Sequence, residues 1–266
     1  MKIDHIYFTG DIHGQFEPLV FTLISGKYQL KDSAVFVCGD IGMGFCKPNY
    51  YNELFLRMNK KLSKNNVHLY FIRGNHDDPS YFHNTPDKLK NISHIHLIDD
   101  WDTVQINDHN ILCIGGATST DRIYRTVNVS WWADESVTEI PDDLKYNCDI
   151  IISHTGPMFV PPKYERIPWM DESDDERAKL DRKILAKLYF QMCENNNPVK
   201  YWFYGHYHDH FESSLPNTGK FSDYEKNLLL GGSDIDTEFF TDNLCQFIGL
   251  NMSENNGVNL DLFQLC

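Results

Sequence analysis

The chain has 266 residues, of which 41% are hydrophobic, and a formal net charge of −14 at pH 7. This length allows one large hydrophobic core, so we expect a single domain over residues 1–266. An acidic surface repels nucleic-acid backbones and anionic lipid, so neither a nucleic acid nor a membrane is an expected partner.

The seven cysteines are odd in number and include no Cys-x-x-Cys pair. Thiols in this pattern are typical of a reduced, cytoplasmic protein. The first nine residues lack the composition of a signal peptide, and no apolar run approaches the roughly 18 residues that a membrane span requires. We therefore expect a cytoplasmic location.

Five short apolar runs are each followed by residues with chemically active side chains. The runs are 6–9, 34–38, 67–72, 150–153 and 201–204. Runs of this length next to glycine or polar residues predict strands that are buried on both faces. The residues that follow them are, in chain order, Asp11, His13, Asp40, Asn75, His76, Asp77, His154, His206 and His208. Because functional groups collect beyond the carboxyl ends of such strands, we expect these side chains to share one crevice.

Helices are predicted between several of these strands. Apolar side chains recur at helical spacing over residues 16–24 and 49–65. A third helix is predicted from Ser173, which with Glu176 forms a capping-box pattern, to Met192.

The end of the chain is rich in predicted strands. They lie at 228–230, 245–250 and 259–265, and residues 212–226 are predicted to form a polar loop. Early strand–helix alternation followed by a strand-rich end predicts an α/β (α+β) fold. We expect a four-layer αββα sandwich, in which two mixed β-sheets pack face to face with helices outside.

Residues 116–147 form a long segment without clear periodicity. A loop of this length in a compact domain is usually functional or disordered, and its two adjacent tryptophans argue against disorder. We expect an inserted loop on the substrate side of the domain. Arg122 and Arg125 are its candidates for phosphate contact, because guanidinium binds phosphate through two parallel hydrogen bonds. The alternative is that they pair with Asp121 or Asp134 at the surface.

The residues after the five strand-like runs offer oxygen and nitrogen donors and no thiolate. Such a donor set favours Mn, Fe or Zn over a soft metal. Seven ligands would be too many for one tetrahedral ion. They would suit two divalent ions that share a carboxylate, as in two-metal hydrolases whose ions lie roughly 3.5–4 Å apart. The donor set therefore points to a dinuclear hydrolase.

Five sequence blocks resemble, in order, the motifs of the calcineurin-like metallophosphoesterase superfamily. The blocks are Asp11-Ile12-His13, Gly39-Asp40, Gly74-Asn75-His76-Asp77, His154 and Gly205-His206-Tyr207-His208. A lone Gly-His-x-His is common, whereas five blocks in family order are specific. The segment from Gly115 to Arg122, followed by a double Trp, also resembles small bacterial and phage members. The resemblance implies the same αββα sandwich.

The resemblance also implies a role for each residue of these blocks. One metal would be held by Asp11, His13 and His208, and the other by Asn75, His154 and His206, with Asp40 bridging the two. His76 would protonate the leaving group, which suits an imidazole with a pKa normally near 6.5. Asp77, the second catalytic candidate, would orient His76 or cap the following turn.

One branch of the superfamily is not matched. Its protein serine/threonine phosphatases carry Gly-Asp-x-x-Asp-Arg-Gly, whereas this chain has Met43 and Gly44 at the second Asp and the Arg positions. We therefore do not expect protein-phosphatase activity of that type.

The expected function is hydrolysis of phosphomonoesters or phosphodiesters by a dinuclear metal-dependent phosphoesterase, with in-line attack of metal-bound hydroxide. The expected partner is a phosphoester substrate. One alternative is a nuclease or cyclic-nucleotide phosphodiesterase, which would need a groove built from Trp131, Trp132, Lys163 and Arg166. Another is a non-catalytic binding module on the same fold, although none of its seven ligand positions is replaced here.

Overall fold

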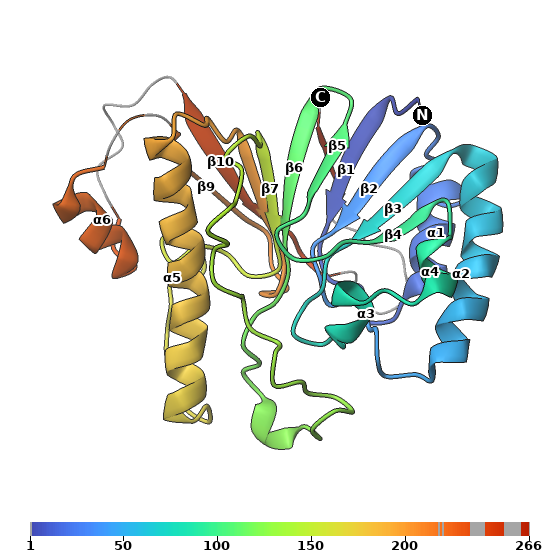
Figure 1. The fold of residues 1–266 in the computed structure, drawn as a ribbon, viewed down its shortest axis with the longest axis horizontal. Coiled ribbons are helices and arrows are strands. Elements are labelled where there is room, and N and C mark those ends of the chain that lie inside the picture. The colour runs from blue at the N-terminus through green and yellow to red at the C-terminus, as the bar shows by residue number, and fades with distance from the viewer. Residues whose placement is uncertain (1, 218, 220, 235–242, 253–261, 266) are drawn as a thin grey trace.

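The computed structural model describes residues 2–217, 219, 221–234, 243–252 and 262–265. Within these residues the chain forms two β-sheets covered by helices (Figure 1). The first sheet contains, from edge to edge, β11 (Phe263–Leu265), β1 (His5–Thr9), β2 (Ser33–Val37), β3 (Val67–Phe71) and β4 (Ile95–Leu97). Strands β1 to β4 are parallel and β11 is antiparallel to β1, so the sheet is mixed.

The second sheet is also mixed. It contains, from edge to edge, β5 (Thr103–Ile106), β6 (His109–Ile114), β7 (Ile150–Ser153), β8 (Tyr201–Tyr204), β10 (Leu244–Gly249) and β9 (Phe211–Pro216). Its four central strands are parallel, and the edge strands β5 and β9 are antiparallel to their neighbours. The buried residues of the central strands are mostly apolar because both faces are covered, whereas His109, Asn110 and Gln246 stand at exposed or partly exposed positions.

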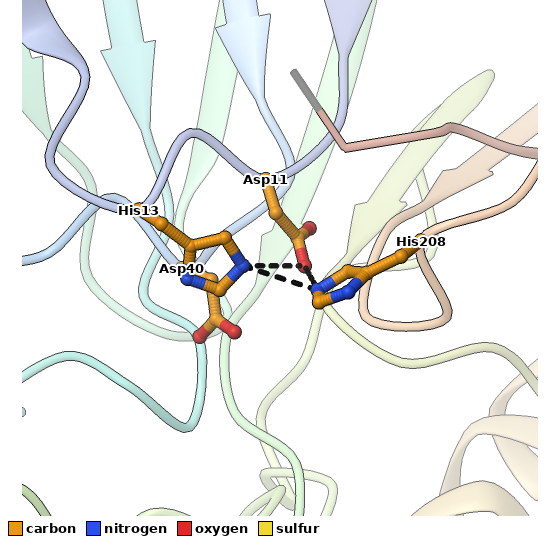
Figure 2. Close-up of side chains that lie close together, drawn as sticks. All are labelled: Asp11, His13, Asp40 and His208. Atoms are coloured by element: carbon orange, nitrogen blue, oxygen red, sulfur yellow. Dashed lines mark hydrogen bonds and ion pairs between the residues drawn. The ribbon is translucent and has the colours of Figure 1, made fainter. Parts of the chain in front are cut away.

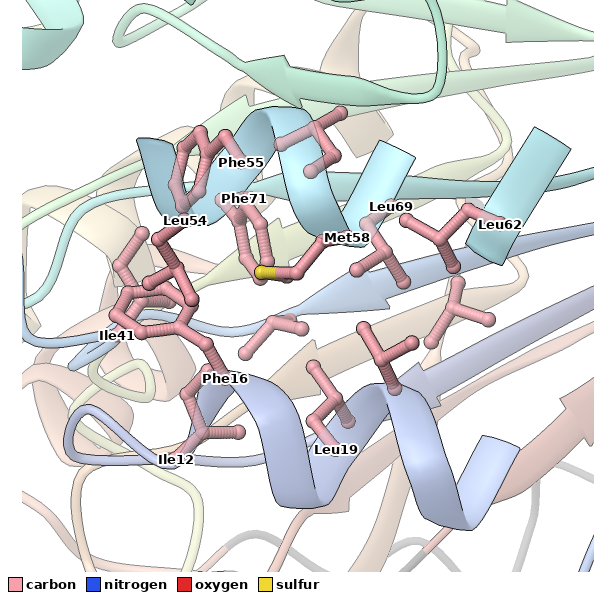
Figure 3. Packing of buried hydrophobic residues seen from close by; sticks show 14 of the residues in the cluster. Ile12, Phe16, Leu19, Ile41, Leu54, Phe55, Met58, Leu62, Leu69 and Phe71 are labelled. Atoms are coloured by element: carbon pink, nitrogen blue, oxygen red, sulfur yellow. The ribbon is translucent and has the colours of Figure 1, made fainter. Parts of the chain in front are cut away.

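Two helices cover the outer face of the first sheet, α1 (Phe16–Ile24) and α2 (Pro48–Leu62). Pro48 opens α2, at a position where its missing N–H costs nothing. The apolar stripes of both helices meet the sheet, as the packing of Phe16, Met58 and Phe71 shows (Figure 3). The helices predicted at 16–24 and 49–65 are thereby confirmed, the second ending in the short turn η1 (Ser63–Asn65).

The helix α5 (Glu172–Glu194) covers the second sheet (Figure 1). Leu185, Leu188 and Tyr189 are fully buried against that sheet. The residue that caps α5 is Asp171, whose carboxylate accepts from the backbone N–H of Asp174 at 2.9 Å. The predicted cap at Ser173 was therefore wrong.

A third apolar cluster fills the space between the two sheets. Phe8 stacks on Phe203 of the opposite sheet with ring centroids 3.9 Å apart, and on Phe36 of its own sheet at 5.5 Å. The rings are all fully buried. With helices outside both sheets, the layer order is α, β, β, α, which confirms the predicted sandwich.

The remaining elements are short. They are α3 (Ser80–His83), α4 (Asp87–Lys90), η2 (Arg122–Tyr124) and α6 (Asp223–Leu230). The strand predicted at 228–230 is thus the end of α6, and the predicted polar loop at 212–226 contains most of β9 and the start of α6. The strand at 245–250 is confirmed as β10. Of the strand predicted at 259–265, residues 259–261 lie outside the described residues. No helix in the described ranges is long and apolar enough to cross a membrane.

The 116–147 segment projects at the end of the molecule where the parallel strands finish (Figure 1). It contains η2 and an isolated bridge between Val127 and Trp131. Arg73, fully buried after β3, anchors the returning part of the segment. Its guanidinium pairs with Asp100 at 2.6 Å and donates to the carbonyl oxygens of residues 134–136. The segment is therefore fixed to the sheet by a buried cation.

Candidate metal centre

The five strands that precede the predicted site residues end side by side. Thr9 of β1 pairs with Val37 of β2, which in turn pairs with Phe71 of β3. In the second sheet, Ser153 of β7 pairs with Tyr204 of β8. The turns after these strands bring together Asp11, His13, Asp40, Asn75, His76, His154, His206 and His208.

Four of these side chains converge on one point (Figure 2). Ligand atoms of Asp11, His13, Asp40 and His208 all lie within 4.8 Å of one another. Nε2 of His208 is 3.0 Å from Oδ2 of Asp11, and the Nε2 atoms of His13 and His208 are 3.1 Å apart. The two carboxylates are buried, whereas the two imidazoles are partly exposed, so the cluster is open to solvent on the histidine side.

A second group of donors surrounds His154, which is fully buried. Its Nε2 lies 2.9 Å from Oδ1 of Asn75 and 3.3 Å from Oδ1 of Asp40. Its Nδ1 donates to the carbonyl oxygen of Cys38 at 2.7 Å, because that oxygen can only accept. This bond fixes the ring so that Nε2 faces the other donors. The ring of His206 lies 5.0 Å away, centroid to centroid.

The donor atoms around Asp11 fit a divalent cation. Oδ2 of Asp11 is buried, and its ion-pair partners are Nε2 of His208 at 3.0 Å and Nε2 of His13 at 3.8 Å. A buried carboxylate is costly unless positive charge compensates it, and a cation among these atoms would supply that charge. Donors about 2.1 Å from a tetrahedral ion lie roughly 3.4 Å from one another. The separations among Asp11, His13 and His208 are 3.0, 3.1 and 3.8 Å.

Burial and charge act in opposition on the ionisable groups of the site. Burial alone would raise the pKa of Asp40, but the neighbouring histidines, His154 above all, hold it well below 3.8. Burial would lower the pKa of His154, yet Asp40 and Asp11 raise it to about 9. A bound cation would take the place of that proton. Burial and His154 hold the pKa of His206 well below 6.5, so its neutral ring keeps a lone pair for a metal.

The glycines of the sequence blocks allow the carboxylates to approach the backbone closely. A Cβ on Gly74 would lie 2.0 Å from Oδ1 of Asp40, and one on Gly205 would lie 2.3 Å from Oδ1 of Asp11. Any side chain at these positions would displace a metal-ligand candidate. The need for glycine before Asn75 and before His206 is therefore steric.

Four of the candidate ligands have left-handed backbone conformations. Their φ angles are 42° for His13, 49° for Asp40, 71° for His206 and 55° for His208. Residues other than glycine are uncommon in this region, and the surrounding structure has to impose it. Such strain concentrates at functional sites, which agrees with a site built to hold its donors in place.

His76 lies at the edge of the cluster. Its backbone N–H donates to Oδ1 of Asp40 at 2.8 Å, and its Nε2 is 3.7 Å from Oδ2 of the same residue. Arg125 reaches in from the 116–147 segment and donates from Nη2 to Nε2 of His76 at 3.0 Å. The Arg125 guanidinium also makes two hydrogen bonds of 2.6 Å to Asp121. Arg125 is therefore both paired with Asp121 and placed at the site.

Asp77 contacts the backbone of two loops. Its buried carboxylate accepts at 2.7 to 3.1 Å from four backbone N–H groups, those of Ile41, Gly42, Met43 and Gly74. These bonds join the loop after Asp40 to the turn after β3. Asp77 thus holds the loop that carries Asp40, and its predicted catalytic role stays a prediction.

Arg122 contacts residues outside the cluster of candidate ligands. Its Nη1 donates to the carboxylate of Asp174 at 2.7 Å, and its guanidinium lies over the ring of Trp131 at 4.6 Å. Both contacts hold Arg122 beside α5. A phosphate contact from Arg122 is therefore not supported by its position.

Two buried residues behind Asn75 were not among the predicted site residues. Nδ2 of Asn75 donates to Oγ of Ser119 at 3.0 Å, and this hydroxyl donates to Oε2 of Glu135 at 2.5 Å. Oε1 of Glu135 accepts from the backbone N–H of Ser119 at 2.8 Å. Because a carboxylate can only accept, the Ser119 proton points at Glu135 and its lone pair at Asn75. The amide oxygen of Asn75 is thereby turned toward His154.

The family profile described as calcineurin-like phosphoesterase matches residues 5–210. The chain therefore belongs to the calcineurin-like phosphoesterase family, whose general chemistry is metal-dependent hydrolysis of phosphoesters. This match confirms the resemblance found in the five sequence blocks.

The solved structures to which the chain is similar share little sequence with it. A crystal structure of TT1561 of Thermus thermophilus has 11% identity and a TM-score of 0.49, and the match covers 94% of this chain and 90% of that one. A protein serine/threonine phosphatase from Saccharomyces cerevisiae, described as similar to human phosphatase PP5, has 15% identity and a TM-score of 0.35, over 96% and 82% of the two chains. No curated protein matches the chain significantly.

Proposed function

We propose that the protein is a dinuclear metal-dependent phosphoesterase. The observation that carries the proposal is the convergence of oxygen and nitrogen donors from the strand ends of both sheets. In this proposal Asp11, His13 and His208 hold one ion, Asn75, His154 and His206 hold the other, and Asp40 lies between them. Mn, Fe or Zn would suit these donors. When bound, the two ions would supply positive charge for the phosphoryl oxygens and lower the pKa of a water.

His76 and Arg125 would act on the substrate together. Arg125 donates to Nε2 of His76, so that nitrogen is an acceptor and cannot at the same time carry a proton for the leaving group. A phosphate is a stronger partner for a guanidinium than an imidazole is. If Arg125 moves onto the phosphate, Nε2 of His76 becomes free to be protonated and to donate to the departing oxygen.

The electrostatics of His76 agree with this exchange. Burial lowers its pKa, Asp40 opposes that effect, and Arg125 lowers the pKa further. Moving Arg125 onto a substrate phosphate would remove a positive charge from His76 and favour the protonated ring that a general acid needs.

The nuclease alternative has little support from the residues that were its candidates. Trp131 and Trp132 are 7% and 6% exposed, so neither offers a face on which bases could stack. Lys163 pairs with Asp234. Two divalent ions would change the formal charge from −14 to −14 + 4 = −10, which still repels a polyanion. We therefore favour small phosphoesters.

We also propose a cytoplasmic location and a single domain with the 116–147 segment inserted on its substrate side. Six cysteines are free in the described part of the chain, which agrees with a reducing compartment. The position of Arg125 supports the placement of the inserted segment.

The test is metal-dependent hydrolysis of two simple esters. Protein stripped with a chelator and reloaded with Mn, Fe or Zn is assayed with p-nitrophenyl phosphate and bis-p-nitrophenyl phosphate, which separates monoesterase from diesterase activity. We expect turnover with metal and none without it. Asp40→Asn should lower metal occupancy in elemental analysis, whereas Asp108→Asn, at an exposed turn residue, should not. Metal-loaded protein that is inactive on both esters would overturn the proposal.

A further inference from the structure

A cavity of about 580 Å³ lies next to the candidate metal centre. Its lining comes from the start of the 116–147 segment, from the loop after β7, from α5 and from the turn after β8, and comprises Ala117, Thr118, Thr120, Thr155, Pro162, Lys163, Tyr164, Glu165, Ile167, Met170, Ala178, Asp181, Arg182, His206 and Tyr207. A volume of this order is that of a small-molecule site. Because His206 is also a metal-ligand candidate, a phosphoester bound at the centre would have this cavity within reach of its organic group.

The hydroxyl groups deep in the cavity wall are already hydrogen-bonded to the protein. Thr118 donates to Asp181 at 2.7 Å, and the hydroxyls of Thr155 and Tyr207 are 2.7 Å apart. Tyr164 donates to Asp175, 2.7 Å from its carboxylate. The fifth lining hydroxyl, that of Thr120, belongs to a partly exposed residue. The wall therefore offers a ligand few unused donors.

The charged groups of the cavity are likewise engaged or exposed. The buried guanidinium of Arg182 donates to the carbonyl oxygens of residues 156, 157, 160 and 162. The buried carboxylate of Asp181 accepts from Thr118 and from the backbone N–H of Val137. Lys163 and Glu165 are the exposed charged residues of the lining, so basic and acidic side chains are present in equal number. A polyanion would gain no net attraction from this wall.

The remaining surface of the cavity is apolar and aromatic. It comprises the side chains of Ala117, Pro162, Ile167, Met170 and Ala178 and the rings of Tyr164 and Tyr207. The ring of Tyr207 is itself stacked on Arg182, whose guanidinium is 5.4 Å from the ring centroid. These groups can bury apolar area and stack on a flat ring.

We propose that this cavity binds the organic group of the substrate, and that this group is an uncharged planar ring, as in an aryl-type or nucleoside monophosphate. A hexose or polyol in the cavity would lose the hydration of its hydroxyls without finding matched partners in the wall and, unlike an aryl group or a nucleobase, would bring no planar ring to stack, which disfavours hexose and polyol phosphates. The proposal rests on the proposed phosphoesterase function, because it assigns the phosphate to the neighbouring metal centre.

Binding and turnover together test the proposal. Benzyl phosphate, adenosine monophosphate, glucose 6-phosphate and glycerol 1-phosphate are compared as substrates of metal-loaded protein, since all four have alkyl leaving groups of similar reactivity. We expect the KM values of the two ring esters to lie at least about tenfold below those of the other two, as expected for burial of one ring. The ratio between benzyl phosphate and adenosine monophosphate distinguishes an aryl group from a nucleoside. Equal or lower KM values for glucose 6-phosphate would overturn the proposal.

A variant that fills the cavity provides a second readout. Ala178→Phe should weaken binding of benzylphosphonate, measured by calorimetry, by about tenfold or more, and that of methylphosphonate much less. Leu180→Phe enlarges an exposed apolar residue of the same helix and should leave both unchanged. If circular dichroism shows that Ala178→Phe does not fold, the smaller substitution Ala178→Leu is used in its place. Equal losses for the two phosphonates would overturn the proposal. Tight phosphonate binding without turnover of any ester would instead count against the phosphoesterase function.

Discussion

Two histidines of the centre, His154 and His76, differ in burial and in hydrogen-bond partners, and these differences suit them to different roles. His154 is fully buried and donates through Nδ1 to a carbonyl oxygen, so only its Nε2 is available for a metal. His76 is partly exposed, and its Nε2 contacts the guanidinium of Arg125, which we propose moves onto the substrate phosphate. The first environment suits a metal ligand and the second a proton donor.

His76→Ala should therefore separate catalysis from metal binding. We expect kcat to fall by ~10²–10⁴, the usual contribution of a general acid, while metal content stays at the level of the unmodified protein. His83→Ala, at a histidine that pairs with Asp99 outside the cluster, is the matched control and should change neither. Turnover unchanged by His76→Ala would remove this residue from the mechanism.

Ser119 and Glu135 should act on the metal through Asn75. Without the Ser119 hydroxyl, Nδ2 of Asn75 loses its acceptor and the amide is free to turn its nitrogen toward the metal. Ser119→Ala and Glu135→Gln should each weaken metal binding by about 10–100-fold, as is usual for residues that orient a ligand. Metal competition with a chromogenic chelator gives the dissociation constants, and the visible spectrum of the cobalt-loaded protein reports a lost ligand.

Ser136→Ala is the control for these two variants. Ser136 lies in the same segment and bonds through its hydroxyl to Thr118 and Arg177, but not to Asn75. It should leave the metal affinity unchanged. If Ser119→Ala lowers only thermal stability, and the cobalt spectrum and metal affinity stay the same, Ser119 does not position the ligand.

The convergence of the candidate ligands could be predicted because each closely follows a short apolar run, and neighbouring parallel strands end at the same edge of a sheet. Glu135 could not be predicted in this way. It lies 60 residues from Asn75 in the sequence, and Ser119 connects the two only after the 116–147 segment has folded back. Asp77 shows a related limit, since its four backbone partners depend on how two loops meet.

Among the helices and strands, the predictions were confirmed where buried residues recur with the regular spacing of a helix or form a continuous apolar run. The central strands β1, β2, β3, β7 and β8 each contain a short apolar run, and α1 and α2 have apolar stripes at helical spacing, so these sequences indicate the type of element. The edge strand β9 has polar and apolar residues without such a run, and its pairing to β10 involves residues that follow about 30 positions later. The capping error at α5 has a local cause, because Asp171, Ser173 and Asp174 are all residues that can cap a helix.

Asp181 links α5 to the 116–147 segment and should make stability depend on pH. Burial raises its pKa to about 7, whereas an unfolded Asp has a pKa of about 3.9. Between about pH 4 and pH 7 the folded state therefore binds more protons than the unfolded state, so this group lowers stability as pH rises through that window. At pH 8 the charged carboxylate costs on the order of 4 kcal/mol.

Asp181→Asn should remove this pH dependence. We expect the variant to exceed the unmodified protein in free energy of unfolding at pH 8, and the difference to disappear near pH 4, because an amide can still bond to Thr118 and Val137 without carrying charge. Urea unfolding at pH 8 and at pH 4 measures the difference in free energy of unfolding between the variant and the unmodified protein. Asp143→Asn, which changes an exposed carboxylate of the 116–147 segment, is the control. A variant that is less stable at pH 8 would show that the charge of Asp181 is needed.

For the molecule as a whole, the centre is one place where polar groups from the two sheets meet. Asp11, Asp40 and Asn75 follow strands of the first sheet, and the candidate ligands His154, His206 and His208 follow strands of the second. The core between the sheets is apolar, so the sheets are held together mainly by apolar packing. Bound ions would add coordination bonds between residues of the two sheets at the ends of the strands. They would also offset the repulsion between the buried carboxylates Asp11 and Asp40.

Removal of metal should therefore lower the stability of the entire fold. At free metal concentrations 100 times the dissociation constant, each site adds about 2.7 kcal/mol, so two sites add roughly 5 kcal/mol. For a chain of this size that amounts to a fall in Tm of roughly 10–20 °C on chelation, reversed when the metal is restored. Scanning calorimetry of the unmodified protein and of Asp40→Asn, with and without chelator, measures it. The variant, which lacks the carboxylate proposed to be shared, should respond much less, and an equal response of both proteins would mean that the stabilising ions bind elsewhere.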